Sequence, residues 1–323
     1  MIAAQAYVRR CHDVNLQLSR VPSSRALGYS LLLGAQLAVG AAAIFARYAL
    51  AAAQPLAVAA LRLLLAALIL VGISAASGAL RENVNRSARL VLIVAGIALA
   101  IHFATWIASL EYTTIAVSTL LVCTTPIWTS LYDAVVLKRR LPPAVWFAYC
   151  GGAVGLWLVV GGAGSTPPIT GHQVFGAGLA LAGSLAIGAY FILVRTVRAA
   201  LATTTIVTWT YSWAAIALTI GALVTRQPAP PLHATGAWLG ILAMALISQL
   251  LGHTAMNASL RWFSPSAIAM ATLLEPIFAA LLAAAIFAER LTAQAISGGI
   301  ILLGAIAVVL FYESPPTPEL KLD

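Results

Sequence analysis

A glutamate, Glu275, lies in the middle of a long apolar stretch and directly precedes Pro276. A charged group inside a bilayer costs roughly 2.5–3.5 kcal/mol on insertion scales, so such groups usually face a helix-bundle interior or a water-filled cavity. Pro276 has no N–H to donate, which leaves a carbonyl one turn earlier without its helical partner and predicts a kink. The carboxylate could therefore bind a substrate amine or carry a coupling proton. Alternatively, it pairs with Arg62, which lies inside another apolar stretch, and holds the kink against a neighbouring helix.

Polar and aromatic side chains share helical faces in two other apolar stretches. His102 and Trp106 are one helical turn apart, and so are His253 and Asn257. Such groups would suit an amphipathic solute if they converged near the middle of the membrane, because the indole could cover its apolar part. A histidine could also relay protons near neutral pH. Each histidine could instead be a packing residue that is bonded to a backbone carbonyl.

A polar residue and a glycine one turn later occur at matching positions of two stretches, as Gln36 with Gly40 and as Ser184 with Gly188. Small residues allow helices to approach closely in lipid, so the glycines favour helix packing. Gln36 could bond either a substrate or a neighbouring helix, and Tyr190 could line the same cavity or face lipid. The candidate substrate-binding residues are Gln36, Gly40, His102, Trp106, Ser184, Gly188, Tyr190, His253, Asn257 and Glu275.

The composition indicates that these residues are positioned by membrane helices. Hydrophobic residues make up 62% of the chain and charged residues only 8%, whereas soluble domains carry about a quarter charged residues. A bilayer core about 30 Å thick needs roughly 20 apolar residues as a helix. Ten continuous stretches qualify, which favours helices over the shorter, alternating strands of a barrel: about 26–49, 55–77, 88–111, 114–137, 142–162, 173–196, 203–225, 235–260, 264–288 and 292–312.

The chain contains two copies of one five-helix unit. The segment Ala108–Leu141 is echoed by Ala258–Leu291: both begin with Ala-Ser-Leu, both contain Pro-Ile at matching positions, and both end with Arg-Leu. Because five is odd, the second copy must cross the membrane in the opposite sense, and inverted repeats place a substrate site near the midplane between them. We predict a tail over 1–25, the first copy over 26–162, a linker over 163–172, the second copy over 173–312 and a disordered tail over 313–323.

The basic residues predict the orientation of the chain. Only Arg47, Arg226 and Arg290 lie on the side away from the N-terminus. Because cytoplasmic loops carry an excess of Lys and Arg, both tails are predicted to be cytoplasmic in a multi-pass protein of the cell (inner) membrane. The net charge of +9 is then an insertion signal, not a surface for nucleic acid. The basic residues on the N-terminal side are Arg9, Arg10, Arg20, Arg25, Arg81, Arg86, Arg89, Lys138, Arg139, Arg140, Arg195, Arg198, Arg261 and Lys321. Asp133, close to the Lys138–Arg140 segment, is expected to form an ion pair with it.

Three segments of the second copy resemble the EamA-type repeat of the drug/metabolite transporter superfamily. They are ASLRWFSP (Ala258–Pro265), LLEPIFAALLA (Leu273–Ala283) and AERLTAQAISGGIILLG (Ala288–Gly304). The resemblance covers nearly all of residues 26–312. It implies an all-α membrane protein with ten transmembrane helices in two inverted repeats. It also implies a secondary transporter of small metabolites, often an exporter of amino acids, that works by rocking of its two halves. The first copy has Thr124-Thr125-Pro126 where the second has Leu274-Glu275-Pro276. Any role of the glutamate would therefore belong to the second copy alone.

The apolar stretches carry no recognisable nucleophile with its base, no stretch with two carboxylates and no nucleotide-binding loop, so we expect neither an enzyme nor a cofactor or metal site. The expected function is transport, through a midplane cavity, of small metabolites, with neutral or aromatic amino acids first and export as the direction. The partners are then a small-molecule substrate, the lipid bilayer and, as a candidate coupling ion, protons. A multidrug-type exporter of other solutes or a channel-like permease are the alternatives.

Overall fold

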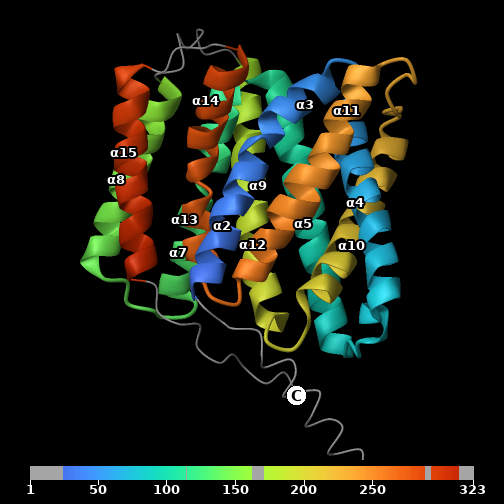
Figure 1. Cartoon of the computed structure of the whole chain (residues 1–323), viewed down its shortest axis with the longest axis horizontal. Coiled ribbons are helices and arrows are strands. Elements are labelled where there is room, and N and C mark those ends of the chain that lie inside the picture. The colour runs from blue at the N-terminus through green and yellow to red at the C-terminus, as the bar shows by residue number, and fades with distance from the viewer. Residues whose placement is uncertain (1–24, 114, 162–170, 288–291, 313–323) are drawn as a thin grey trace, which may run out of the picture.

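The structure is a computed structural model that describes residues 25–113, 115–161, 171–287 and 292–312. The described residues form ten helical crossings, and no strand occurs among them (Figure 1). Residues 1–24 and 313–323 of the predicted tails, residues 163–170 of the predicted linker, and Arg290 lie outside the described residues. Among the described residues, seven helices are long and apolar enough to cross a membrane. Together with the shorter apolar helices they confirm the expected all-α fold of ten transmembrane helices.

The first copy contains α2 (Arg25–Gly40) with α3 (Ala42–Leu50), α4 (Pro55–Ser77), the single turn η1 (Ala79–Arg81), α5 (Arg86–Tyr112), α6 (Ile115–Val122) with α7 (Thr125–Val135), and α8 (Pro143–Gly161). The second copy contains α9 (Gly171–Val197), α10 (Thr203–Val224), α11 (Thr235–Ala243) with η2 (Met244–His253) and α12 (Thr254–Ser259), α13 (Pro265–Ala271) with α14 (Leu274–Phe287), and α15 (Ala293–Phe311).

The fourth and ninth crossings are both interrupted one turn before a proline. In the fourth crossing, Pro126 cannot donate to the Val122 carbonyl, and the Thr125 hydroxyl donates to it instead at 2.8 Å. In the ninth crossing, Pro276 cannot donate to the Thr272 carbonyl, which accepts instead from the Glu275 backbone N–H at 2.9 Å. The kink that the sequence predicts at Pro276 is therefore present, and its mate in the first copy has the same cause.

The two copies run in opposite senses and cap each other. α4 and α10 are paired helices of the two copies and pack against one another. Where α4 begins, the Gln227 side chain accepts from the Leu56 N–H at 2.8 Å. Where α10 begins, the Glu82 carboxylate accepts from the Ala202 N–H at 3.1 Å. Each copy thus supplies the side chain that satisfies an N-terminal N–H of its mate in the other copy, which requires the two helices to be antiparallel.

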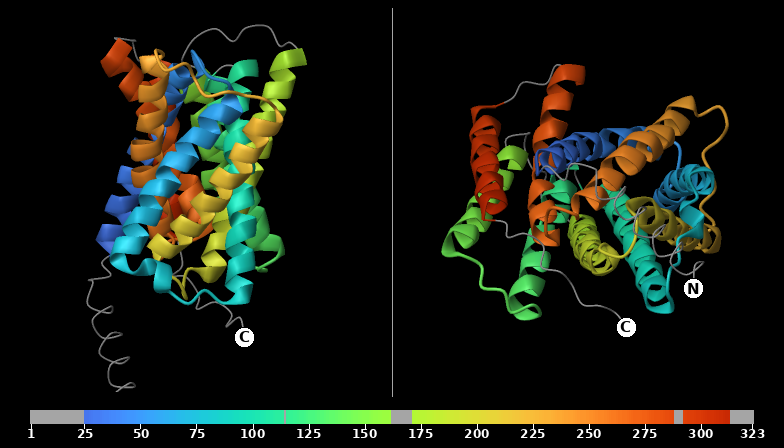
Figure 2. Two further views of the ribbon diagram at one scale, coloured as in Figure 1. Left: turned by 90° about the vertical axis from the view of Figure 1, so that its right-hand side faces the viewer. Right: turned by 60° about the horizontal axis from the view of Figure 1, so that its bottom comes forward.

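The copies interleave and do not form two separate lobes (Figure 2). The most extensive packing joins α5 to α9, α4 to α10 and α8 to α15, each pair taken from both copies. The contact of α5 with α9 is mirrored by that of α2 and α3 with the crossing of α11, η2 and α12. The fold therefore depends on contacts between the copies at every crossing.

Two hydrophobic cores result, and each is built from both copies. The larger one is formed by buried residues of the first, second, third, sixth, seventh and eighth crossings, such as Leu63, Phe103 and Tyr211, together with residues of α13. The smaller one is formed largely by the fourth, fifth, ninth and tenth crossings, with Leu156 and Leu302 near its centre. In Figure 1, α8 and α15 stand at the left edge, away from the larger core. The boundary between the cores runs along the interrupted helices.

A buried hydrogen bond crosses between the copies at the lower end of Figure 1, where α7 ends and α13 begins. The Ser266 hydroxyl donates to Asp133 Oδ2 at 2.6 Å, and both side chains are buried. α7 and α13 pack along this contact. The sequence-based expectation of an ion pair with Lys138–Arg140 did not anticipate this partner from the second copy.

The α8–α15 contact yields a stability prediction. A Cβ added at Gly298 would lie 2.6 Å from the Gly155 carbonyl oxygen, whereas one added at Gly299 would meet nothing within 4 Å. Gly298→Ala should therefore push the helices apart and cost about 1–3 kcal/mol. Gly299→Ala should be neutral or slightly stabilising because alanine favours helix. Thermal unfolding of the purified variants measures both, and equal unfolding temperatures would contradict this packing.

Candidate functional site

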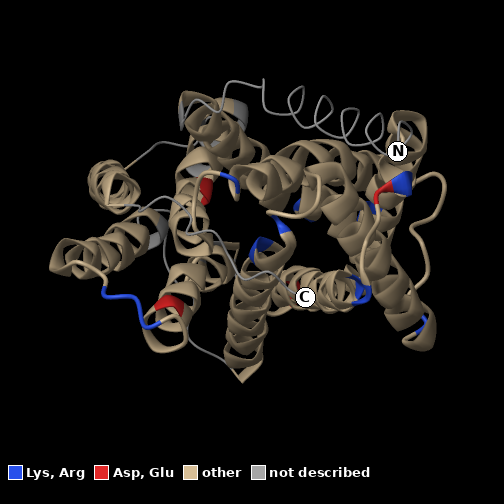
Figure 3. Cartoon of the chain, turned by 90° about the horizontal axis from the view of Figure 1, so that it is seen from below, with Lys and Arg blue, Asp and Glu red and all other residues tan. Residues whose placement is uncertain are grey.

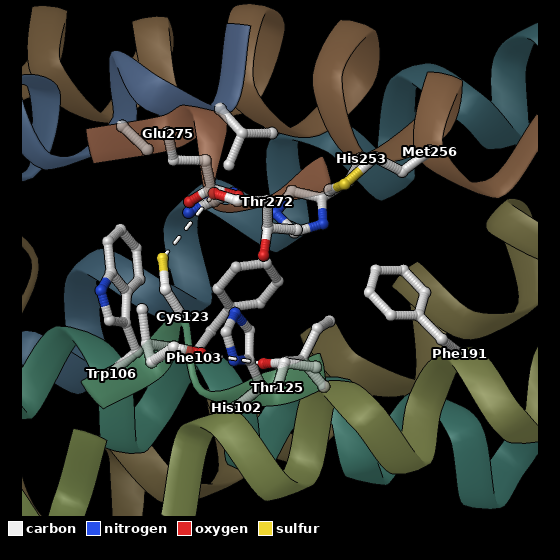
Figure 4. Close-up of a pocket in the computed structure, with 15 residues that line it drawn as sticks. His102, Phe103, Trp106, Cys123, Thr125, Phe191, His253, Met256, Thr272 and Glu275 are labelled. Carbon is white, nitrogen blue, oxygen red and sulfur yellow. Dashed lines mark hydrogen bonds between the residues drawn. The ribbon is translucent and has the colours of Figure 1, made fainter. Parts of the chain in front are cut away.

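An interior cavity of about 40 Å³ lies at the interruptions of the first, fourth and ninth crossings. Its lining residues come from both copies: Glu275, His253 and Thr272 of the second copy face His102, Phe103 and Thr125 of the first (Figure 4). Because one water needs roughly 10–15 Å³ by this measure, the cavity has room for only a few waters. A larger solute therefore requires the surrounding helices to move apart.

The two helix interruptions meet at this cavity. The Cys123 thiol donates to the Thr272 carbonyl, with 3.7 Å between sulfur and oxygen. This carbonyl is the one that Pro276 leaves without its helical donor. The thiol comes from the interruption of the fourth crossing. A donor at the interruption of one copy therefore bonds the carbonyl that is freed at the interruption of the other. The cavity wall is consequently formed by the turns on which the two copies join.

Arg62 of α4 brings a fully buried guanidinium to the cavity. Its Nε donates to the Gln249 side-chain oxygen at 3.1 Å, and its Cζ lies 4.1 Å above the centre of the Phe103 ring. Nη1 and Nη2 have no hydrogen-bond partner. Glu275 lines the same cavity, but no direct ion pair joins it to Arg62. The structural interpretation of Glu275, as a tie to a neighbouring helix through Arg62, stays a prediction.

Gly40 allows α2 to reach the helix that carries Glu275. A Cβ at Gly40 would lie 3.0 Å from Phe278 Cβ and 3.1 Å from the Glu275 carbonyl oxygen. These contacts are tight enough that α14 would have to shift. Gly40 itself does not line the cavity. It thus supports the site through close helix approach, as its spacing in the sequence favours.

Both imidazoles line the cavity. His102 Nδ1 lies 2.9 Å from the Gly183 carbonyl, so this nitrogen carries a proton and donates it to the carbonyl oxygen. The His102 ring stacks on Trp106 with 6.2 Å between centroids and 3° between planes. His253 ends the π-helical stretch η2, packs edge-on against Phe103, and has no partner at Nδ1. The two histidine rings are 6.3 Å apart.

The predicted residues therefore divide into two groups. His102, Trp106, His253 and Glu275 line the cavity, and the remaining candidates lie outside its lining: Gln36, Gly40, Ser184, Gly188, Tyr190 and Asn257. Ser184 accepts from the Trp128 indole N–H at 3.1 Å and bonds Thr125 at 3.2 Å, which fastens α9 to the break of the fourth crossing. Gly188 lies beside Thr125 and Thr129 on the same seam.

Tyr190 and Asn257 form a second buried seam. The Tyr190 hydroxyl donates to Asn257 Oδ1 at 2.9 Å, and Asn257 Nδ2 donates to the His253 carbonyl at 2.8 Å. This chain of bonds connects α9 through α12 to the cavity histidine. Gln36 is fully buried, and neither atom of its amide has a partner. An unsatisfied buried polar group costs about 1–3 kcal/mol, so a ligand that bonded this amide would recover that cost. The predicted contact of Gln36 with substrate stays a prediction.

Several lining residues were not among the sequence candidates. Thr125 occupies the position that Glu275 has in the second copy, and Phe103 matches His253, so alignment of the copies contains the signal for both. Arg62 was considered only as a partner of Glu275. Phe191 and Met256 are ordinary apolar residues, and nothing in their sequence context distinguishes them from lipid-facing or core positions.

Comparison with known proteins supports this architecture. A family model described as "EamA-like transporter family" matches residues 26–161 and 174–311. No curated protein matches the chain. A solved structure titled "Crystal structure of protein" superposes with a TM-score of 0.74 at 16% sequence identity, over 89% of this chain and 98% of that one. At this identity the likeness shows the fold alone.

The division into lining and supporting residues can be tested at Tyr190. Tyr190→Phe removes the donor to Asn257 and leaves a buried acceptor unsatisfied, which should cost about 1–3 kcal/mol of stability. Because the hydroxyl does not line the cavity, the apparent affinity for a transported solute should change less than about twofold, which is under 0.5 kcal/mol. Thermal unfolding and uptake kinetics measure the two effects. A large loss of affinity with unchanged stability would place Tyr190 in the binding site.

Proposed function

Because the chain belongs to the EamA-like transporter family, we propose that it is a secondary transporter that exports small metabolites, with neutral or aromatic amino acids as its substrates. The observation that carries this proposal is the cavity itself, which combines one carboxylate with aromatic walls. Glu275 offers an acceptor for a substrate ammonium group, and Phe103, Trp106 and Phe191 offer surface for an apolar side chain. A solute with both features matches this lining.

Alternating access is supported by the two cores and by their boundary at the cavity. The repeats interleave, so they cannot be the rigid bodies that move. The larger and smaller hydrophobic cores are better suited to this role, because packed cores resist deformation. Across this boundary α2 packs against α14, and α9 packs against α6 and α7, so these are the contacts that would have to change. Separation along this boundary would open the cavity to one side at a time.

Protons are the proposed coupling ion. Glu275 and His253 both line the cavity, and the His253 imidazole Nδ1 has no hydrogen-bond partner. Intramembrane ionisable groups of this kind commonly mark proton relays and substrate pathways. Protonation of Glu275 would remove the charge that holds a substrate ammonium. Proton binding and amine binding at this residue would then exclude one another, which is the basis of exchange.

Reconstituted liposomes test the substrate class. We expect saturable uptake of labelled phenylalanine, with counterflow that a channel would not show. Glu275→Gln should raise the apparent KM about ten- to a hundredfold, because a charge-assisted bond contributes about 1.5–3 kcal/mol, and should flatten the pH dependence. Glu111→Gln, an exposed acid at the end of α5, is the matched control and should behave as wild type.

Two results would contradict this proposal. Wild-type rates equal to those of empty liposomes across a broad panel of labelled amino acids would end the amino-acid assignment. Unchanged rate and pH dependence in Glu275→Gln would show that Glu275 is neither the amine ligand nor the proton carrier. A screen for resistance to toxic amino-acid analogues on overexpression would identify the preferred substrate and the direction in cells.

We also propose that the lower end of Figure 1 faces the cytoplasm of a cell (inner) membrane, with both termini on that side. Seen from this end, the connection between α7 and α8 is basic (Figure 3). Arg198 lies just beyond the end of α9 at the same end. Burial and the nearby Arg261 lower the pKa of its guanidinium to about 10. It is therefore still charged at neutral pH and counts toward the positive-inside bias.

Thiol labelling tests this orientation. Ala200→Cys lies between α9 and α10, Ala229→Cys lies between α10 and α11, and both positions are exposed. In a background without the native cysteines, a membrane-impermeant maleimide should label Ala229→Cys in intact cells. It should label Ala200→Cys only after the membrane is permeabilised. The reverse pattern would invert the topology, and labelling of both in intact cells would contradict the inverted repeat.

A further inference from the structure

We infer that Arg62 binds the carboxylate of the transported solute, so that a zwitterion is held by its two charged ends between Arg62 and Glu275. This inference deepens the proposed function and rests on it. The supporting observation is geometric: a guanidinium on the cavity wall is held firmly at one edge and has no partner at the other. Sequence reasoning gave Arg62 a structural role only, and the arrangement around it changes that view.

The guanidinium is oriented by contacts with two other crossings. Gln249 of η2 accepts from Nε at 3.1 Å, and the Phe103 ring of α5 lies under Cζ at 4.1 Å. The hydrogen bond fixes one edge of the plane, and the ring fixes one of its faces. Nη1 and Nη2 remain as parallel donors, a spacing that matches the two oxygens of a carboxylate. A lysine could supply the positive charge at this place but not the two parallel N–H donors.

The buried charge requires an anion. Arg62 is completely inaccessible to solvent, and a cation in such a place is stabilised only when it is paired and its donors are satisfied. The cation–π contact with Phe103 supplies part of this stabilisation. Gln249 is neutral, and Glu275 forms no direct ion pair with Arg62. Arg62 and Glu275 are the charged residues of opposite sign on the cavity wall, and His102 and His253 are its other titratable groups besides the Cys123 thiol.

A zwitterion satisfies both charges without adding a net charge to the membrane interior. Its carboxylate would occupy the Nη1 and Nη2 donors, and its ammonium group would face Glu275. The remaining wall is uncharged apart from the two histidines, with Phe103 beneath the guanidinium and Phe191 and Met256 among its apolar residues. A third charge on the solute would find no counter-charge among the described lining residues. The site thus selects solutes with one acid, one amine and an uncharged side chain.

The test uses ligands that each lack one charged end. Phenylalanine carries both ends, 3-phenylpropionate only the carboxylate, and 2-phenylethylamine only the ammonium group. Each is added to the purified full-length chain in nanodiscs, and the ligand-induced rise in unfolding temperature is measured. Wild type should be stabilised by all three, most by phenylalanine. Arg62→Gln should lose the response to 3-phenylpropionate, with at least a tenfold weaker affinity, and keep the response to 2-phenylethylamine. Glu275→Gln should show the opposite pattern.

Two further variants keep the test decisive. Arg198→Gln removes a partly buried arginine outside the cavity lining and should leave all three responses as in wild type. Arg62→Lys retains the charge without the two parallel N–H donors, so its affinity for 3-phenylpropionate should fall about tenfold even if Arg62→Gln does not fold. Equal affinity of Arg62→Lys and wild type for 3-phenylpropionate would overturn the inference. A parallel loss of both single-ended ligands in Arg62→Gln would overturn it too, because that is the signature of a structural role.

Failure of the proposed function is distinguishable from failure of this inference. If wild type takes up phenylalanine but the Arg62 variants are stabilised by 3-phenylpropionate as strongly as wild type, the inference fails and the transport function stands. If no ligand stabilises wild type and liposomes take up none of the amino acids, both fail together. Selective loss of the carboxylate ligand in Arg62→Gln, with uptake by wild type, supports both.

Discussion

A backbone carbonyl in a bilayer has no water to bond, and every interruption of a membrane helix must therefore find another donor. Pro126 and Pro276 create such interruptions at matching positions of the two copies. The first is satisfied within its own turn by the Thr125 hydroxyl. The second draws on its own turn and on the Cys123 thiol from the other copy. This requirement places the two breaks next to one another, and the cavity, the boundary between the two cores and the position of Glu275 all follow from that placement.

The duplication gives two similar frames that carry different chemistry. Thr125 and Glu275 occupy matching positions before the two prolines, yet one is a small hydroxyl that caps a turn and the other is a carboxylate on the cavity wall. Phe103 and His253 differ in the same manner, one as the platform under Arg62 and the other as a titratable group. The frame is thus symmetric while its polarity is not, which allows one end of a solute to be distinguished from the other.

The fold could be predicted almost entirely from the sequence, because apolar length, short matches between the copies and proline chemistry are local signals. The ten crossings and the break at Pro276 are examples. The site could be predicted only in part. Periodicity places Gln36, Ser184 and Asn257 on polar faces, but it does not indicate which neighbouring helix each face meets. Arg62 and Gln249 are brought together by η2, whose π-helical turns rotate its side chains away from ordinary helical positions. No spacing in the sequence indicates such a stretch.

The interleaving of the copies has a consequence for biogenesis. The first five helices leave the ribosome and enter the bilayer before any of the helices with which they pack most extensively has been made. During that interval the Arg62 guanidinium lacks Gln249, and the start of α4 lacks the cap from Gln227. The partly synthesised chain is therefore an intermediate in which these polar groups lack their partners until the second copy has been inserted. Its assembly is completed from the carboxyl-terminal side, so a translation product truncated near the middle would be a substrate for membrane quality control.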